Sequence, residues 1–402
     1  MKTHKKVILL LLFIVNVSFA QWVQISTIGN YELRAVKFFN EHTGIVAGEG
    51  GIWRSTNSGV NWVQVLSVPN MNAVSFADIN VGFSVGDTAK IYKTTNGGVN
   101  WSILGSPVTQ NLKGVWFVNQ NTGYAVGDLG KILKSTNSGA SWQIQTSQFT
   151  EDLNGVHMAD AQNGYIVGST TNEVCAGTGN GGFNWLYNLN LPNNTLWAIS
   201  SIPPGTANVI AVGSNGRIRL STSFGTSWTL VASNSTQQLN GIQFLDGSTG
   251  FIVGNSGTIL MSTNSGLNWN TQSSSTSNHL KGINFINVNT GWAVGMNGVV
   301  LRTGIPVGIK HQEVELKSFR LYQNFPNPFN PSTRISFDIL TSSKVKISVY
   351  NARGKLINVL IDQIMEAGKH SVDFEGQYPS GVYFFQMEID KYKETIKSIL
   401  IK

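Results

Sequence analysis

The chain has 402 residues, of which 43 are glycine, 10% are aromatic and only 12% are charged. This composition excludes a disordered chain and is typical of a β-rich protein with many glycine turns. The formal net charge is +7, but residues 21–304 carry 12 basic against 11 acidic side chains. Such a balance excludes the basic face of a nucleic-acid-binding protein.

The first twenty residues have the pattern of a signal peptide. Three lysines precede the apolar run Val7–Val15, and small residues at positions 18 and 20 indicate cleavage before Gln21. The run is too short for a membrane-spanning helix, so we expect residues 1–20 to direct export. The single cysteine, Cys175, cannot form an internal disulfide, and an exported fold must then be held by its core or by closure of its sheets.

A pattern of eight residues, Ser/Thr-x-Asn-x-Gly-x-x-Trp, recurs along the chain and is called here the boxed turn. Four copies are clear: Ser55–Trp62, Thr94–Trp101, Ser135–Trp142 and Ser262–Trp269. Two are weaker: Thr178–Trp185 and Ser221–Trp228, in which Ser223 replaces the asparagine. We expect the asparagine to bond the backbone of its own turn, the glycine to take a positive φ, and the tryptophan to pack between repeats. Structural roles are therefore predicted for Asn57, Trp62, Asn96, Trp101, Asn137, Trp142, Asn264 and Trp269.

The repeats have the period of a β-propeller blade. Trp22 begins a series of tryptophans that recur at intervals of 39–43 residues, and a period near 40 with several short strands per unit is typical of propellers. Seven sets of first, second and third strands follow one another, but only six boxed turns with a fourth strand. We therefore predict an all-β, seven-bladed β-propeller over residues 21–304, in which residues 21–25 supply the missing fourth strand by pairing with residues 299–303.

The fourth unit departs from the others. The segment Asn172–Ala176 replaces the usual Gly-x-Ile sequence of the third strand, and the boxed turn that follows is weak. Drift at a variable position is the favoured interpretation, and a local functional change is the alternative.

A second composition begins after the repeats. Residues 305–322 have the mixed charge of a linker, and the proline-rich segment Asn324–Thr333 favours an extended entry. Several strand-like runs follow, and Asn351–Gly354 is typical of a hairpin turn. We predict a small, immunoglobulin-like β-sandwich over residues 323–402.

The boxed turn resembles the Asp-box of sialidase-type propellers. The whole unit, with its Val-Gly second strand and Ser-Thr-Asn-Gly turn, is similar to propellers of the photosynthesis system II assembly/stability factor family over residues 21–304. In photosynthetic members this resemblance implies a protein-binding assembly factor. It does not transfer the client, because one fold serves many partners.

The last eighty residues resemble the C-terminal sorting domain of the type IX secretion system of Bacteroidota. The matching segments are Asn324–Pro331, Val349–Lys355, Pro379–Phe384 and Lys397–Lys402. The resemblance implies recognition by the type IX translocon through residues 323–402 and a secreted or cell-surface location. Whether the domain is then cleaved stays open.

Sialidase chemistry would need an arginine cluster for the substrate carboxylate, a tyrosine nucleophile with a glutamate partner, and an acid/base aspartate. The arginines of the repeats do not form such a triad on the first strands of separate blades; they are Arg34, Arg54, Arg217, Arg219 and Arg302. We therefore predict no catalytic residues, no cofactor and no enzyme. A carbohydrate-binding or sialidase-like glycoside hydrolase propeller is kept as the alternative.

Three carboxylates follow second strands at equivalent places: Glu49, Asp87 and Asp128. They could form a shallow patch for a hard cation. Turn chemistry explains them more simply, because aspartate is a common turn residue. No metal site is therefore predicted.

Binding is the remaining function, and it is expected on one face of the ring. Loops from second to third strands, and from fourth strands to the next blade, share one face, called here the loop face. Rigid sheets commonly present such loops for recognition. The partner is an unknown protein or glycan, and the candidate binding residues are Glu49, Asp87, Asp128, Asn215, Asn255, Asn297, Arg34 and Trp197.

Overall fold

The computed structural model describes residues 22–169, 172–192, 194–203, 207–304, 319–339, 342–375, 377–389 and 392–402. The predicted signal peptide and residues 305–318 of the predicted linker lie outside the described residues. The chain divides into two compact units between residues 307 and 308. Each unit is described by itself.

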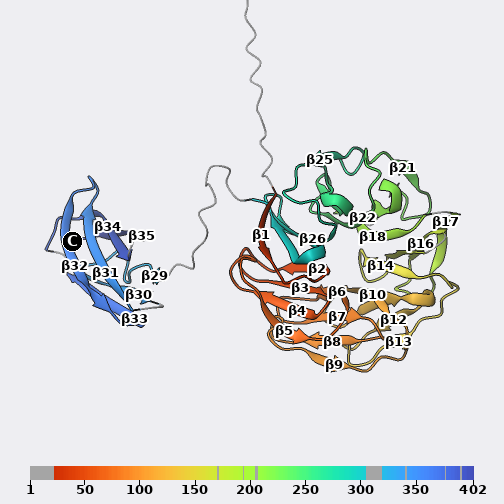
Figure 1. Ribbon diagram of the computed structural model, residues 1–402, viewed down its shortest axis with the longest axis horizontal. Helices are drawn as coiled ribbons and strands as arrows, with labels where there is room; N and C mark the ends of the chain where they lie inside the picture. The colour runs from red at the N-terminus through yellow and green to blue at the C-terminus, as the bar shows by residue number, and fades with distance from the viewer. Residues whose placement is uncertain are drawn as a thin grey trace, which may run out of the picture. The chain divides into compact units, whose positions relative to one another are not determined.

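The first unit is a ring of seven four-stranded antiparallel sheets, as predicted (Figure 1). Blade one begins with β2 and blade seven with β26. The first strands line the centre of the ring: β2 (Leu33–Phe38), β6 (Met71–Phe76), β10 (Leu112–Phe117), β14 (Leu153–Met158), β18 (Leu196–Ser201), β22 (Leu239–Phe244) and β26 (Leu280–Asn287). The second strands are β3 (Gly44–Gly48), β7 (Gly82–Gly86), β11 (Gly123–Gly127), β15 (Gly164–Gly168), β19 (Val209–Gly213), β23 (Gly250–Gly254) and β27 (Thr290–Gly295).

The outer half of each blade holds the third and fourth strands. The third strands are β4 (Gly51–Ser55), β8 (Ile91–Thr94), β12 (Ile132–Ser135), β16 (Asn172–Thr178), β20 (Ile218–Ser221), β24 (Ile259–Ser262) and β28 (Val299–Arg302). The fourth strands are β5 (Val63–Ser67), β9 (Ser102–Leu104), β13 (Gln143–Ile144), β17 (Leu186–Pro192), β21 (Thr229–Val231), β25 (Asn270–Gln272) and, in blade seven, β1 (Val23–Thr27). Second strands are buried along their whole length because neighbouring blades cover both faces.

The N-terminal strand closes the ring, as predicted from the missing boxed turn. β1 pairs antiparallel with β28, and Val23 lies opposite Arg302. Trp22 is 2% exposed, and its ring meets Phe285 edge-on at 5.6 Å, while Phe285 stacks on Phe251 of blade six at 4.1 Å. Trp22 therefore takes the place that a boxed-turn tryptophan takes in the other blades.

The same aromatic arrangement recurs inside the chain. Trp142 meets Phe117 edge-on at 5.8 Å, and Phe117 stacks on Phe83 of the preceding blade at 3.7 Å. Gly139 of that turn packs against the Phe83 ring, where a Cβ atom would lie 2.3 Å from ring carbon Cε1. The close approach and the φ of 74° explain why this position is glycine.

Each boxed turn is tied by its own side chains. In the first copy, the Gly59 N–H donates to Ser55 Oγ (2.9 Å), the Asn61 N–H to Asn57 Oδ1 (2.9 Å), and the Trp62 indole N–H to the Gly59 carbonyl (2.8 Å). The copy in blade four, weak in sequence, makes the equivalent backbone bonds to Thr178 and Asn180. The boxed turns lie on the face of the ring opposite the loop face, where the first strands end.

Blade four differs in its third strand. β16 and β17 are seven residues long, and the Glu173 side chain on β16 is only 1% exposed. Its two oxygens meet Arg217 Nε at 2.8 Å and Arg219 Nε at 2.7 Å, both on the third-strand side of blade five. The irregular sequence therefore supplies a buried inter-blade ion pair with two arginines.

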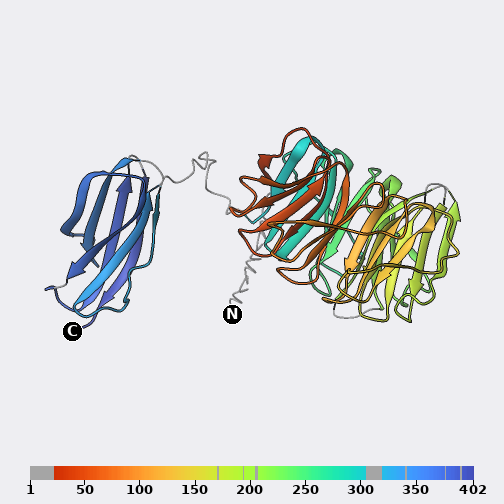
Figure 2. The ribbon, with the colours of Figure 1, turned by 90° about the horizontal axis from the view of Figure 1, so that it is seen from below.

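The second unit is a β-sandwich of two facing sheets, as predicted (Figure 2). One sheet has the order β29-β30-β33 and the other β32-β31-β34-β35. Apolar side chains such as Phe337, Ile347 and Phe385 fill the space between them. The strands are β29 (Phe319–Leu321), which lies inside the predicted linker, β30 (Ser332–Ile339), β31 (Ser343–Asn351), β32 (Leu356–Met365), β33 (Gly368–Glu375), β34 (Gly381–Ile389) and β35 (Tyr392–Leu400).

The proline-rich entry to the sandwich is fixed by one buried amide. The Asn324 side chain is 2% exposed, and its Nδ2 donates to Thr333 Oγ1 and Ser398 Oγ, both at 2.8 Å, and to the Pro326 carbonyl. This asparagine joins the entry segment to the first and last long strands. These buried hydrogen bonds explain why an asparagine stands at the start of the sorting-domain motif.

Candidate functional site

Four of the seven second-to-third-strand loops of the loop face share one conformation. Each contains a single 3-10 turn: Asp128–Gly130, Ser214–Gly216, Asn255–Gly257 and Met296–Gly298. The middle residue of each has a φ of 54–57°, and asparagine tolerates that region well. Asn215 and Asn297 occupy it, and their amides donate to Asn194 and Asn278 on the neighbouring loop.

The second residue of every first strand lies at the mouth of the ring on the loop face. Three of them are asparagines that donate to a carbonyl of the next blade: Asn72 to Leu112, Asn154 to Leu196 and Asn240 to Leu280, at 2.7–2.9 Å. The blades are thus joined at this mouth by buried or half-buried amides. The complete set is called here the mouth ring: Arg34, Asn72, Lys113, Asn154, Trp197, Asn240 and Lys281.

Two predicted residues meet through a member of this ring. Arg34 Nη1 donates to Asn72 Oδ1 at 2.6 Å, and Asn72 Nδ2 donates to Asp87 Oδ1 at 2.9 Å. Glu32 lies between Arg34 and Lys281, with nitrogen–oxygen distances of 3.5 and 3.4 Å. Arg34 and Asp87 therefore belong to one network that spans blades seven, one and two.

A second network surrounds Lys113. Its Nζ lies 2.6 Å from Asp128 Oδ1 and 2.9 Å from Asp152 Oδ2, and Asn111 donates to Asp128 at 2.9 Å. Burial opposes ionisation of both ends of the pair. For Asp152 this is the largest single effect, but the hydrogen bonds from Lys113 and the Leu129 N–H, together with the charge of Lys113, outweigh it and lower the pKa of Asp152. The two carboxylates likewise outweigh burial at Lys113 and raise its pKa.

The remaining predicted residues have local partners. Glu49 accepts from the Glu32 N–H (3.0 Å), the Trp197 indole donates to Ser214 (3.3 Å), and Asn255 accepts from Asn240 (3.0 Å). The eight candidates thus lie on one face but in separate networks. Lys113, Asp152 and Lys281 join these networks and were missed, although a charged second residue after the leucine of a first strand is visible in the sequence.

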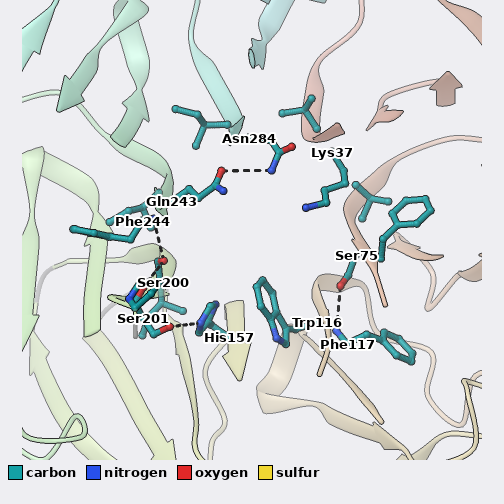
Figure 3. A pocket seen from close by; sticks show the side chains of 17 residues that line it. Lys37, Ser75, Trp116, Phe117, His157, Ser200, Ser201, Gln243, Phe244 and Asn284 are labelled. Atoms are coloured by element: carbon teal, nitrogen blue, oxygen red, sulfur yellow. Dashed lines mark hydrogen bonds between the residues drawn. The ribbon is translucent and has the colours of Figure 1, made fainter. Parts of the chain in front are cut away.

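The opposite end of the ring encloses a cavity of about 320 Å³, called here the central cavity. It is lined by residues from the fourth to the sixth positions of the first strands and, after β18, by Pro203 (Figure 3). The fifth residue of each first strand faces it, and these residues differ in every blade except for two serines. They are Lys37, Ser75, Trp116, His157, Ser200, Gln243 and Asn284.

The hydrogen-bond acceptors of this wall are used between blades. Asn284 Oδ1 accepts from the Phe38 N–H (2.7 Å), Ser75 Oγ from the Phe117 N–H (3.1 Å), and Gln243 Oε1 from the Phe285 N–H (2.8 Å). Each bond joins one blade to its neighbour. A lysine cannot accept such a bond, so Lys37 makes no hydrogen bond of this kind between blades.

His157 is the second titratable group of the cavity wall. Its Nε2 lies 2.8 Å from Ser201 Oγ, and its ring packs against Trp116 with centroids 4.2 Å apart. Burial lowers the pKa of His157 to about 4. The imidazole is therefore neutral near pH 7.

His157 should make the propeller sensitive to acid. The folded chain binds fewer protons there than the unfolded chain between pH 6.5 and about 4, so the free energy of unfolding falls as the pH falls through this window, by about 3 kcal/mol at pH 4. The variant His157→Gln keeps a partner for Ser201 and should lose that part of the acid sensitivity. Denaturant unfolding at pH 7 and pH 4 measures it; an equal acid loss in both proteins would contradict it.

Within the described ranges, no group of three or more histidine, cysteine, aspartate or glutamate side chains is placed to hold a metal ion. The described helices are single 3-10 turns, and none has the length and hydropathy that a membrane crossing requires.

Comparison with known proteins agrees with the ring and its repeats. The family profile of photosynthesis system II assembly factor YCF48 matches residues 99–241 and 220–304, which together span more than half of the chain. The chain belongs to this family. No curated protein sequence shows a significant match to this YCF48-family chain.

The second unit of this YCF48-family protein has its own match. Residues 323–402 match the secretion system C-terminal sorting domain. This domain directs export by type IX secretion, in agreement with the resemblance found in the sequence.

Solved structures show the same fold. YCF48 bound to D1 peptide has 18% identity and a TM-score of 0.60, covering 72% of this chain and 96% of that one. YCF48 from Cyanidioschyzon merolae has 19% identity and a TM-score of 0.59, with coverages of 71% and 98%. The GH74 enzyme of Niastella koreensis has 12% identity and a TM-score of 0.58, with coverages of 93% and 74%.

Proposed function

We propose that this chain is an exported, cell-surface or extracellular protein whose propeller binds a protein partner without catalysis. Residues 323–402 direct its export through the type IX translocon. The observation that carries the proposal is the loop face, where the side chains of the mouth ring are held by bonds between blades before any partner arrives.

The chemistry of the loop face suits a polypeptide. Charges of both signs lie side by side on the part of the mouth formed by blades seven to four, and the side chains of Arg34, Lys113 and Asp152 are 23–28% exposed. A partner can reach these groups without first unfolding the loops. Preorganised, mixed charge favours specific protein binding because little conformational entropy remains to be lost. A peptide-bound YCF48 structure has this fold, and a peptide ligand for this chain is proposed by that analogy.

The loop face offers a matched pair of variants. Leu129 at the tip of a loop-face turn and Leu267 in a boxed turn are both 59% exposed, and they lie on opposite faces. Leu129→Asp should reduce crosslinking of the partner in the protein's own cells by at least about tenfold, because a buried interface does not accept an unpaired charge. Leu267→Asp should leave crosslinking unchanged. Equal crosslinking by both variants would remove the loop face as the binding surface.

Export is tested separately. A chain that ends before residue 323 should accumulate inside the outer membrane, and fusion of residues 323–402 to an unrelated periplasmic protein should carry that protein to the surface. Cell fractionation of a type IX secretion mutant provides the control. Surface exposure of the shortened chain would contradict this role of the second unit.

A carbohydrate-active propeller is the second candidate, since the GH74 enzyme shares the fold. Glycoside hydrolysis requires one carboxyl group that stays protonated at working pH beside an ionised one. Asp128 and Asp152 are neighbours, but Lys113 binds both and the pKa of Asp152 is lowered. Fluorogenic glycosides and a glycan array separate the candidates: turnover favours the enzyme, and retention without turnover favours a lectin.

A further inference from the structure

The central cavity presents donors and apolar surface to its interior. Its amide and serine oxygens accept backbone N–H groups of the next blade, as described above. The amide nitrogens of Gln243 and Asn284 each make one long bond, of 3.3 and 3.4 Å, and each keeps a second N–H. The acceptors of the cavity wall are already bonded to backbone N–H groups, whereas these side-chain N–H donors remain for a ligand. Such a wall is complementary to an anion.

Among the described residues that line the cavity, Lys37 is the only cation and none is a carboxylate. Figure 3 shows its ammonium group pointing into the centre of the cavity, between Asn284 and Trp116. Among the described residues it has no ion-pair or hydrogen-bond partner, and burial lowers its pKa. Even a half-buried ammonium group without a counter-ion costs free energy, which a bound anion would offset.

The remaining surface of the cavity is apolar. The Trp116 ring lies against His157, which is neutral near pH 7, and Val36 and Ile199 line the wall beside them. The cavity of about 320 Å³ equals about ten water volumes. It has room for a carbon skeleton as well as for one charged group.

We propose that the central cavity binds a small organic carboxylate, whose charged group meets Lys37 and whose apolar part lies against Trp116. This site is distinct from the loop face, because it opens at the end of the first strands where the boxed turns lie. Its ligand and the protein partner can therefore bind at the same time.

The test uses the full chain and three probes, benzoate, phenylacetate and isobutyrate, with benzamide as the neutral match for benzoate. Titration calorimetry should show one saturable site for at least one carboxylate and at least about tenfold weaker binding of benzamide. Lys37→Met should weaken carboxylate binding at least about tenfold. Lys131→Met, which removes a lysine from the loop face, should leave it unchanged.

Two further measurements distinguish loss of binding from loss of folding. Thermal unfolding should show that Lys37→Met is folded and at least as stable as the unaltered chain, since it loses an unpaired buried charge. Binding should also weaken as the pH rises through the lowered pKa of Lys37. Among the described residues that line the cavity, the only other titratable group is His157, and the charged residues Arg34, Lys113 and Lys281 lie near the opposite ends of these strands, in the mouth ring. The absence of saturable binding of all three carboxylates, equal binding of benzamide, or undiminished binding by Lys37→Met would overturn the proposal.

Discussion

Replacing Glu173 with alanine is expected to lower the free energy of unfolding of the propeller by about 3–5 kcal/mol. The Glu173 side chain is 1% exposed, and Arg219, its partner at 2.7 Å, is 11% exposed. Without the carboxylate, Arg219 would be left with little water and no counter-ion, and Arg217 would lose its partner as well. Denaturant unfolding of the two proteins measures the difference.

The control for this prediction removes all three charges. The triple variant Glu173→Leu, Arg217→Leu and Arg219→Leu should recover most of the lost stability, because apolar groups of similar volume replace a buried ion cluster at little cost. A loss below about 1 kcal/mol in Glu173→Ala would mean that water reaches the arginines, as at exposed ion pairs.

Replacing Trp22 with alanine is expected to cost about 3–5 kcal/mol and to open the ring. The side chain is 2% exposed, packs on Phe285, and precedes the strand that closes blade seven. A large cavity at this place would weaken the pairing of β1 with β28, which among the described residues is the only sheet ladder between strands from opposite ends of the propeller sequence. Hydrogen exchange should show loss of amide protection in β1 and β28.

Trp269→Ala is the matched control for Trp22. Trp269 is 1% exposed and opens a fourth strand in the middle of the chain. Its removal should cost a similar free energy but leave the protection of β1 and β28 unchanged. Equal loss of protection in both variants would show that closure depends on the general stability of the ring and has no special dependence on Trp22.

The sequence predicts the ring well because each part of a blade has its own chemical signal. The boxed turn needs asparagine and glycine at fixed places, the second strand needs apolar residues on both faces, and counting tryptophans from Trp22 shows which fourth strand is missing. These are local requirements with a fixed period. The prediction of the sandwich was less complete, because β29 lies within the predicted linker and β32 extends to Met365, beyond the predicted hairpin.

The contacts of the candidate sites could not be predicted because they join different blades. Asp128 was predicted as one of three equivalent loop carboxylates and as a candidate binding residue, but in the structure it shares Lys113 of its own blade with Asp152 of blade four. Glu173 was interpreted as drift, and its arginines lie some 46 residues further on. A signal was present for Glu173, since a charge on a third strand at a position where other repeats have none demands a partner once the repeats are stacked.

Lys37 illustrates the same limit. Alternation along β2 predicts that it faces away from Val36 and Phe38, but only a closed ring turns that side into an enclosed cavity. The seven residues that share its position come from seven repeats, and the period aligns them. That all seven residues line one cavity follows from the closed ring and cannot be read from any single repeat.

The pairing of Val23 with Arg302 determines when the propeller can complete its folding. Neighbouring strands of one hairpin can pair as soon as both are made, whereas this ladder must wait until almost the whole ring has been synthesised, and closing so long a loop is slow. Until then β28 and β1 each present an unpaired edge, which is a hazard for aggregation. A chaperone that covers such edges during passage to the outer membrane would therefore protect the nascent ring most at its two ends.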